Sequence, residues 1–155
     1  MEVIDIRRVP RSRHNPQFNR ENLPEALFTA KISYMHFPEL GGLRHPRSGS
    51  QNTGWRNLSF RGFADYMQTK EFETGLERLI ETAGNKKIAL MCAEVLPWRC
   101  HRSLIADALL LRNISVEHIL SLCHSMAHSI TPWALVNGIY ISYPRPETTD
   151  KMIKE

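Results

Sequence analysis

The stretch Lys87-Ile88-Ala89-Leu90-Met91-Cys92-Ala93 decides the fold class, because its apolar side chains follow one another without a polar interruption after Lys87. Such a run is typical of a strand that is buried on both faces, as strands of parallel sheets are. A polar loop over 94–101 follows, and the apolar spacing of 102–112 predicts a helix. This order of strand, loop and helix favours an α/β fold.

Two more strands are predicted upstream, over 3–9 and 32–37, and each is closed by a proline that cannot donate to a ladder. Between them, Asn22 before Leu23-Pro24 has the character of a helix N-cap. Strands separated by helices form right-handed crossover units in a mainly parallel sheet. We therefore predict a Rossmann-like three-layer α/β sandwich.

The remaining pattern is assigned more coarsely. We predict a long loop over 39–60, one or two helices over 63–84, a strand over 116–120, a short helix opening at 131–135 and an edge strand over 139–143. We expect one α/β domain over 1–143 and a flexible C-terminal tail over 144–155.

Length and composition bound the class of protein. A chain of 155 residues with 42% hydrophobic content can bury a core without disulfide bonds or a structural metal. The three cysteines, an odd number, argue against a secreted disulfide framework. No apolar run is long enough to span a bilayer, so we expect a cytoplasmic protein with no membrane partner.

Arginine is concentrated in the first part of the chain. Residues 6–20 hold five arginines and residues 40–64 hold four, and neither segment contains an acidic residue. The planar guanidinium suits bidentate recognition of phosphate or carboxylate. The alternative is that these side chains are ordinary solvated loop charges.

Candidate functional residues lie on two loops that follow predicted strands. Because the carboxyl ends of parallel strands meet at one edge of a sheet, the loop after 3–9 and the loop after 87–93 are expected to converge. The groups suited to acid, base or thiol chemistry are Asp5, Glu94, Cys100 and His101. The groups suited to anion binding, together with the amides of the helix that begins near 102, are Arg7, Arg11, Ser12, Arg13, Arg102 and Ser103.

Each chemical role has a structural alternative. Asp5 could form a structural ion pair with Arg7 or Arg102. Cys92, at the end of an apolar strand, is expected to act as a small hydrophobe. Cys100 is the better nucleophile candidate because a helix N-terminus and adjacent cations lower a thiol pKa, although a structural role is open for it too.

Two familiar motifs are absent. Cys92 and Arg99 are seven positions apart, whereas cysteine-dependent phosphatases need six and a preceding histidine. There is no Cys-x-x-Cys pair and no His-Glu-x-x-His motif, so we predict no metal site; Cys123, His124 and His128 form only a weak metal candidate, and His118 is expected at an edge or in the core. No cofactor is indicated.

Four separated motifs nevertheless resemble one known family. They are Asp5-Ile6-Arg7-Arg8-Val9-Pro10-Arg11-Ser12-Arg13, Asn15-Pro16-Gln17-Phe18-Asn19, Glu39-Leu40-Gly41-Gly42, and Cys92-Ala93-Glu94 with Cys100-His101-Arg102-Ser103. In this order they resemble the prokaryotic family catalogued as domain of unknown function 488, over nearly the whole chain. The resemblance implies a small cytosolic α/β protein whose shared residues gather at the C-terminal ends of parallel strands.

At its N-terminus, the chain departs from the pattern of this family. Members of that family usually have another strand and helix before the Asp-x-Arg strand, whereas this chain begins four residues before Asp5. We therefore expect either a short form that lacks this first strand-helix unit or a chain whose start was placed late.

Three classes of function remain open. The first is an enzyme, of unassigned reaction, that binds a phosphate-bearing or other anionic small molecule such as a nucleotide. The second is a nucleic-acid-binding protein that uses the arginine-rich loops, with Trp55, Phe18 or Phe60 stacking on bases. The third is a domain that binds a ligand without turning it over. The number of subunits is not indicated by the sequence.

Overall fold

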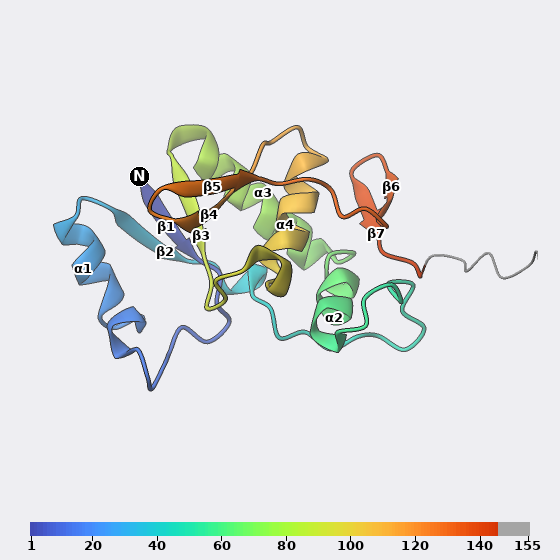
Figure 1. Cartoon of the computed structure of the whole chain (residues 1–155), viewed down its shortest axis with the longest axis horizontal. Helices are drawn as coiled ribbons and strands as arrows, with labels where there is room; N and C mark the ends of the chain where they lie inside the picture. The colour runs from blue at the N-terminus through green and yellow to red at the C-terminus, as the bar shows by residue number, and fades with distance from the viewer. Residues whose placement is uncertain (146–155) are drawn as a thin grey trace, which may run out of the picture.

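A three-stranded parallel sheet lies at the centre of the computed structural model, which describes residues 1–145 (Figure 1). Its strands are β1 (Glu2–Asp5), β2 (Ser33–His36) and β3 (Ile88–Met91), in the order β2-β1-β3. The last residue of β1, Asp5, is in register with the last residues of both β2 and β3. All three strands therefore end at one edge, where the loops that follow them can meet.

Four α-helices accompany the sheet: α1 (Leu23–Thr29), α2 (Leu58–Tyr66), α3 (Lys70–Asn85) and α4 (Arg102–Leu110). Short 3-10 turns, η1 (Pro16–Phe18), η2 (Pro38–Leu40) and η3 (Pro97–Arg99), each begin with proline, whose missing N–H costs nothing there. Figure 1 shows α1 beside β2 at one end of the molecule, apart from α2, α3 and α4. The main core forms where β1 meets the last three helices, with Ile4, Ile6, Phe63, Leu76, Leu79, Leu104 and Ile105 among its members.

The α/β class is confirmed, but the Rossmann-like three-layer sandwich is not. Only Leu23 of α1 is buried, and Phe28 is 81% exposed, so α1 does not form a full covering layer. The prediction that β3 is buried on both faces is also wrong. Its four residues are half-buried, and within residues 1–145 β3 is an edge strand that pairs only with β1.

In the C-terminal part of the described chain, the strands do not join the parallel sheet as predicted. The strand expected over 116–120 exists as β4 (Glu117–Ser121), but it pairs antiparallel with β5 (His124–Ala127) outside the main sheet. The helix predicted at 131–135 is wrong, because β6 (Leu135–Asn137) begins there and pairs with β7 (Tyr140–Ser142). Gly138, with φ +62°, makes the tight turn between them. The edge strand expected over 139–143 is β7.

Local capping explains where the helices start. The helical pattern over 63–84 corresponds to two helices, α2 and α3, which begin after Asn57 and Thr69. The side chains of these two residues accept hydrogen bonds from backbone amides in the first turn of each helix. Asn22 does precede α1, but its side chain donates to the Pro16 carbonyl at 2.8 Å and does not cap the helix. The predicted cap at Asn22 is therefore wrong in its chemistry.

The division into one domain and a tail stays a prediction. The Arg145 amide donates to the Thr53 hydroxyl at 3.2 Å, and residues 146–155 of the predicted tail lie outside the described residues. Within residues 1–145, no helix combines the length and the apolar character that a membrane crossing requires.

Candidate thiol site

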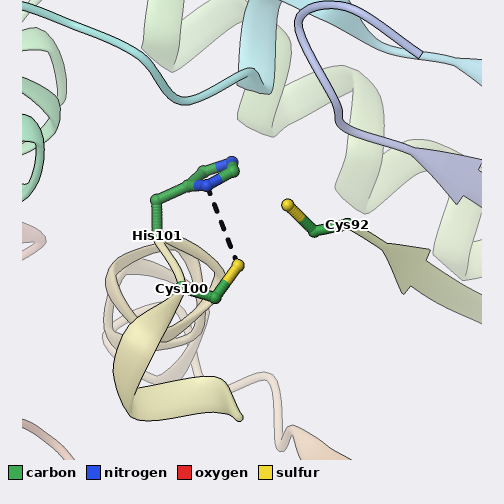
Figure 2. Close-up of side chains that lie close together, drawn as sticks. All are labelled: Cys92, Cys100 and His101. Atoms are coloured by element: carbon green, nitrogen blue, oxygen red, sulfur yellow. Dashed lines mark hydrogen bonds between the residues drawn. The ribbon is translucent and has the colours of Figure 1, made fainter. Parts of the chain in front are cut away.

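Two thiols and one imidazole meet beyond the end of β3. The Sγ atoms of Cys92 and Cys100 and a ring nitrogen of His101 all lie within 4.8 Å of one another, and Cys100 Sγ is 3.8 Å from His101 Nδ1 (Figure 2). Cys92 directly follows β3, whereas Cys100 and His101 directly precede α4. The loop between them, which contains η3, thus folds back and brings the three groups together.

The orientation of His101 is fixed by its surroundings. Its Nε2 lies 3.1 Å from the Leu40 carbonyl, which can only accept, so Nε2 carries a hydrogen and Nδ1 is the ring nitrogen left for the sulfur atoms. A Cβ at Gly42 would lie 2.8 Å from Nδ1, and the Phe63 ring packs against the imidazole at 4.8 Å between centroids. Nδ1 therefore faces the sulfur atoms in a site that only glycine at 42 leaves open.

The two thiols share one ionisation. The hydrogen bond from Cys100 lowers the pKa of Cys92 to about 4, with further help from His101 and the Glu94 amide, although burial acts in the opposite direction. The same hydrogen bond, together with burial, raises the pKa of Cys100. In this pair, the half-buried Cys92 is therefore favoured as the thiolate and the buried Cys100 as the thiol.

Arg102 and Ser103, predicted to bind an anion, hold the loop through hydrogen bonds to its sulfur and carbonyl groups. Arg102 donates from Nε to Cys100 Sγ at 3.2 Å and from one terminal nitrogen to the Glu94 and Val95 carbonyls. The Ser103 hydroxyl donates to the Cys100 carbonyl at 2.9 Å and so has no hydrogen left for an anion. The Glu94 residue itself is exposed beside the site.

Asp5 and Arg7 form a buried ion pair on the first loop. The completely buried Asp5 carboxylate accepts from Arg7 Nε at 2.9 Å, from an Arg7 terminal nitrogen at 2.6 Å and from the Tyr34 hydroxyl at 2.7 Å. Arg7 also donates to the Phe18 carbonyl. These contacts match the structural alternative for Asp5, with Arg7 as its partner.

The other predicted residues of the first loop lie on the surface. Arg11 approaches Glu21 at 3.4 Å, the Ser12 hydroxyl accepts from the Asn15 amide, and Arg13 is exposed. Across residues 1–145, no hydrogen bond joins these three residues to the segment 92–103. The two loops thus share an edge of the sheet, but their predicted side chains do not form one cluster.

Sequence reasoning missed part of this site. Cys92 packs against the core as expected of a small hydrophobe, but its sulfur also faces Cys100 and His101. Leu40 and Gly42, which position His101, belong to a motif noted only as a turn and a family resemblance. Two thiol sulfurs and an imidazole nitrogen are also a donor set that a soft metal ion such as Zn²⁺ would accept, with one position left open.

The fold and the site define a small α/β protein with a dithiol and imidazole centre at the carboxyl edge of a parallel sheet. The family described as Domain of unknown function DUF488 matches residues 2–109, and the chain belongs to this family. No curated protein matches the chain. No solved structure matches it either.

Proposed function

We propose that the protein is an enzyme that uses the Cys92 thiolate as a nucleophile toward an electrophilic, anionic small molecule. The observation that carries this proposal is the approach of three reactive atoms to within 4.8 Å of one another at the carboxyl edge of the sheet. Active sites of open α/β sheets occur at this edge. A thiolate stable at neutral pH is the form of cysteine that attacks electrophiles.

The neighbouring groups have distinct proposed roles. Cys92 Sγ forms a bond to the electrophilic atom of the substrate, and the leaving group departs with the proton of the Cys100 thiol. The Cys100 thiolate left behind is stabilised by Arg102 Nε, 3.2 Å away, and by the amide at the start of α4, 3.5 Å away. The exposed Arg11 and Arg13 are the proposed partners of the anionic substrate, and Asp5 positions Arg7.

The test is the pH profile of alkylation by iodoacetamide, followed at each cysteine by peptide mass spectrometry. The Cys92 rate is expected to stay nearly constant between about pH 5 and pH 8, because its thiolate population does not change there. A short unstructured cysteine peptide, alkylated in the same reaction, is the control; the rate of such an ordinary thiol rises about tenfold per pH unit below about pH 8. H101Q and C100S, which remove groups that stabilise the thiolate, should make the Cys92 profile resemble that of the peptide.

Two results would contradict the proposal. One is a Cys92 rate that rises with pH in the unaltered protein in parallel with the rate of the cysteine peptide. The other is protection of Cys92 that disappears when a chelator is added, which would show that the three groups hold a metal ion.

A further inference from the structure

A second polar cluster, which the thiol chemistry does not use, lies between α4 and the C-terminal hairpins. The completely buried Asp107 carboxylate accepts from His128 Nε2 at 2.8 Å, from the Thr131 amide at 3.0 Å and hydroxyl at 2.7 Å, and from the Tyr143 hydroxyl at 2.8 Å. Because Asp107 is already the acceptor in this contact, His128 Nε2 must carry a hydrogen. The other ring nitrogen of His128 is free for a second contact.

His118 makes that second contact. Its Nε2 lies 2.9 Å from His128 Nδ1, and the two rings meet edge to face. With both rings neutral, His118 Nε2 donates the single hydrogen between them, which leaves the lone pair of His118 on Nδ1. Among the described residues, no hydrogen bond to His118 Nδ1 is formed. Asp107, His128 and His118 thus form a chain from the interior to an unpaired imidazole nitrogen.

His118 lines an apolar cavity of about 300 Å³ between α3, β3, α4 and β4. This volume is at the lower end of the range for small-molecule sites. Its walls are mainly aliphatic and include Leu79, Ile80, Ile88, Leu90, Ala106, Leu109, Ile114 and Val116. Val95 and Ile119, which are 72% and 71% exposed, also line it, so apolar surface continues outward from the cavity.

The charged groups at this cavity favour an anion. Two of them already have partners, because Lys86 approaches Glu2 at 3.3 Å and Glu117 accepts from the Ser125 hydroxyl. Arg102 also lines the cavity, and its second terminal nitrogen forms no hydrogen bond within residues 1–145. The ionisable groups left for a ligand are this nitrogen and His118 Nδ1.

We propose that the cavity binds a small carboxylic acid with an apolar body, whose carboxylate lies between Arg102 and His118. The aliphatic walls take the body, and Arg102 supplies the fixed positive charge. The site shares Arg102 with the thiol centre but uses its other terminal nitrogen, and it does not depend on the proposed thiol chemistry.

Binding at this site takes up a proton. Burial, together with the positive charge of Arg102, holds the pKa of His118 below its ordinary value, so the neutral form of His118 is favoured in the free protein. A carboxylate beside Nδ1 raises that pKa, and Nδ1 is protonated. The hydrogen bond to His128 shares the new charge, which Asp107 compensates. Affinity therefore rises as pH falls toward the pKa of the free imidazole.

The experiment is isothermal titration calorimetry of the full chain with octanoate and, as a matched uncharged probe, 1-octanol. Octanoate is expected to bind at least about tenfold more tightly than octanol, because only octanoate offers a charge to Arg102 and His118. Titrations in buffers of different ionisation enthalpy should show proton uptake with octanoate. Affinity for octanoate should increase between about pH 8 and pH 6.

Variants assign the effect to His118. H118F is expected to remove the proton uptake and to weaken octanoate binding about tenfold, while octanol binding changes little. H124F is the control, because His124 is exposed on β5 and does not line the cavity; it should bind as the unaltered protein does. Equal affinity for octanoate and octanol, octanoate binding without proton uptake, or no binding of octanoate would each overturn the proposal, and all three are measured on the unaltered protein.

Discussion

Replacement of Asp107 with alanine is expected to lower the free energy of unfolding by about 3–5 kcal/mol. The carboxylate is completely buried and accepts four hydrogen bonds, from His128, Thr131 and Tyr143. Alanine removes the acceptor of all four and leaves the donors inside the protein without partners. Because these donors tie the C-terminal hairpins to α4, the loss should be seen in urea unfolding followed by circular dichroism.

The matched control for D107A is Y143F, which removes one donor and keeps the ring. Its expected cost is about 1–2 kcal/mol, since the carboxylate keeps its other three hydrogen bonds. If D107A costs no more than Y143F, the buried carboxylate does not organise this part of the fold.

Replacement of Asp5 with alanine is expected to cost about 3–5 kcal/mol of unfolding free energy as well, because it leaves Arg7 buried without its counter-ion. Arg7 is 8% exposed, and within residues 1–145 the hydrogen bond left to its guanidinium is the one to the Phe18 carbonyl. Y34F, which removes only one hydrogen bond to Asp5, should cost about 1–2 kcal/mol. Chemical unfolding at neutral pH measures both losses.

The Asp5 ion pair also predicts a pH dependence. Burial alone would raise the pKa of Asp5, but the hydrogen bonds from Arg7 and Tyr34 outweigh it and hold this pKa below its ordinary value. A depressed carboxyl pKa contributes stability above the unfolded-state pKa of about 3.9, and this contribution is lost as pH falls through the lower folded-state pKa. The stability difference between the unaltered protein and D5A should therefore shrink below about pH 4. A difference that is constant down to the acid limit would exclude the ion pair as its source.

The elements of the fold that could be predicted are those marked by local sequence patterns, such as apolar runs and prolines. The apolar run that becomes β3, Pro38 after β2, and the apolar face of α4 all place their elements close to where the structure has them. The strand predicted over 3–9 is shorter, because β1 already ends at Asp5. The partners of β4 and β7 could not be predicted in this way. An apolar strand pattern indicates burial, but it does not indicate whether the next strand pairs with it through a tight turn or a helix.

The arginines show a second limit of sequence reasoning. Their number and the lack of nearby acids predicted phosphate recognition, yet several of them donate to backbone carbonyls of neighbouring loops. Arg8 binds the Leu43 carbonyl, Arg44 that of Gly41 and Arg61 that of Trp55. The same guanidinium donors serve either purpose, and only the path of the chain decides between them. Phe60, predicted to stack on bases, is 8% exposed and packs against Trp55.

At the site, the sequence indicated which loop carries the reactive groups, but not that Cys92, Cys100 and His101 meet there. Cys100 and His101 were expected to be reactive, and spacing rules then removed the phosphatase and zinc motifs that would have joined them to Cys92. The three groups nevertheless meet, because the path through η3 brings Cys100 back to the end of β3. Spacing rules describe the loops of known motifs, and this loop has a different length.

The most direct test of the thiol site is an ultraviolet absorbance titration that counts thiolates, made on a C123S background so that only the paired cysteines contribute. The account predicts that the absorbance of one thiolate persists from neutral pH down to about pH 4, because the pKa of Cys92 is lowered to about 4, and that C92S abolishes this signal. A signal that disappears near the ordinary thiol pKa of about 8.5, or one that C92S leaves unchanged, would contradict it.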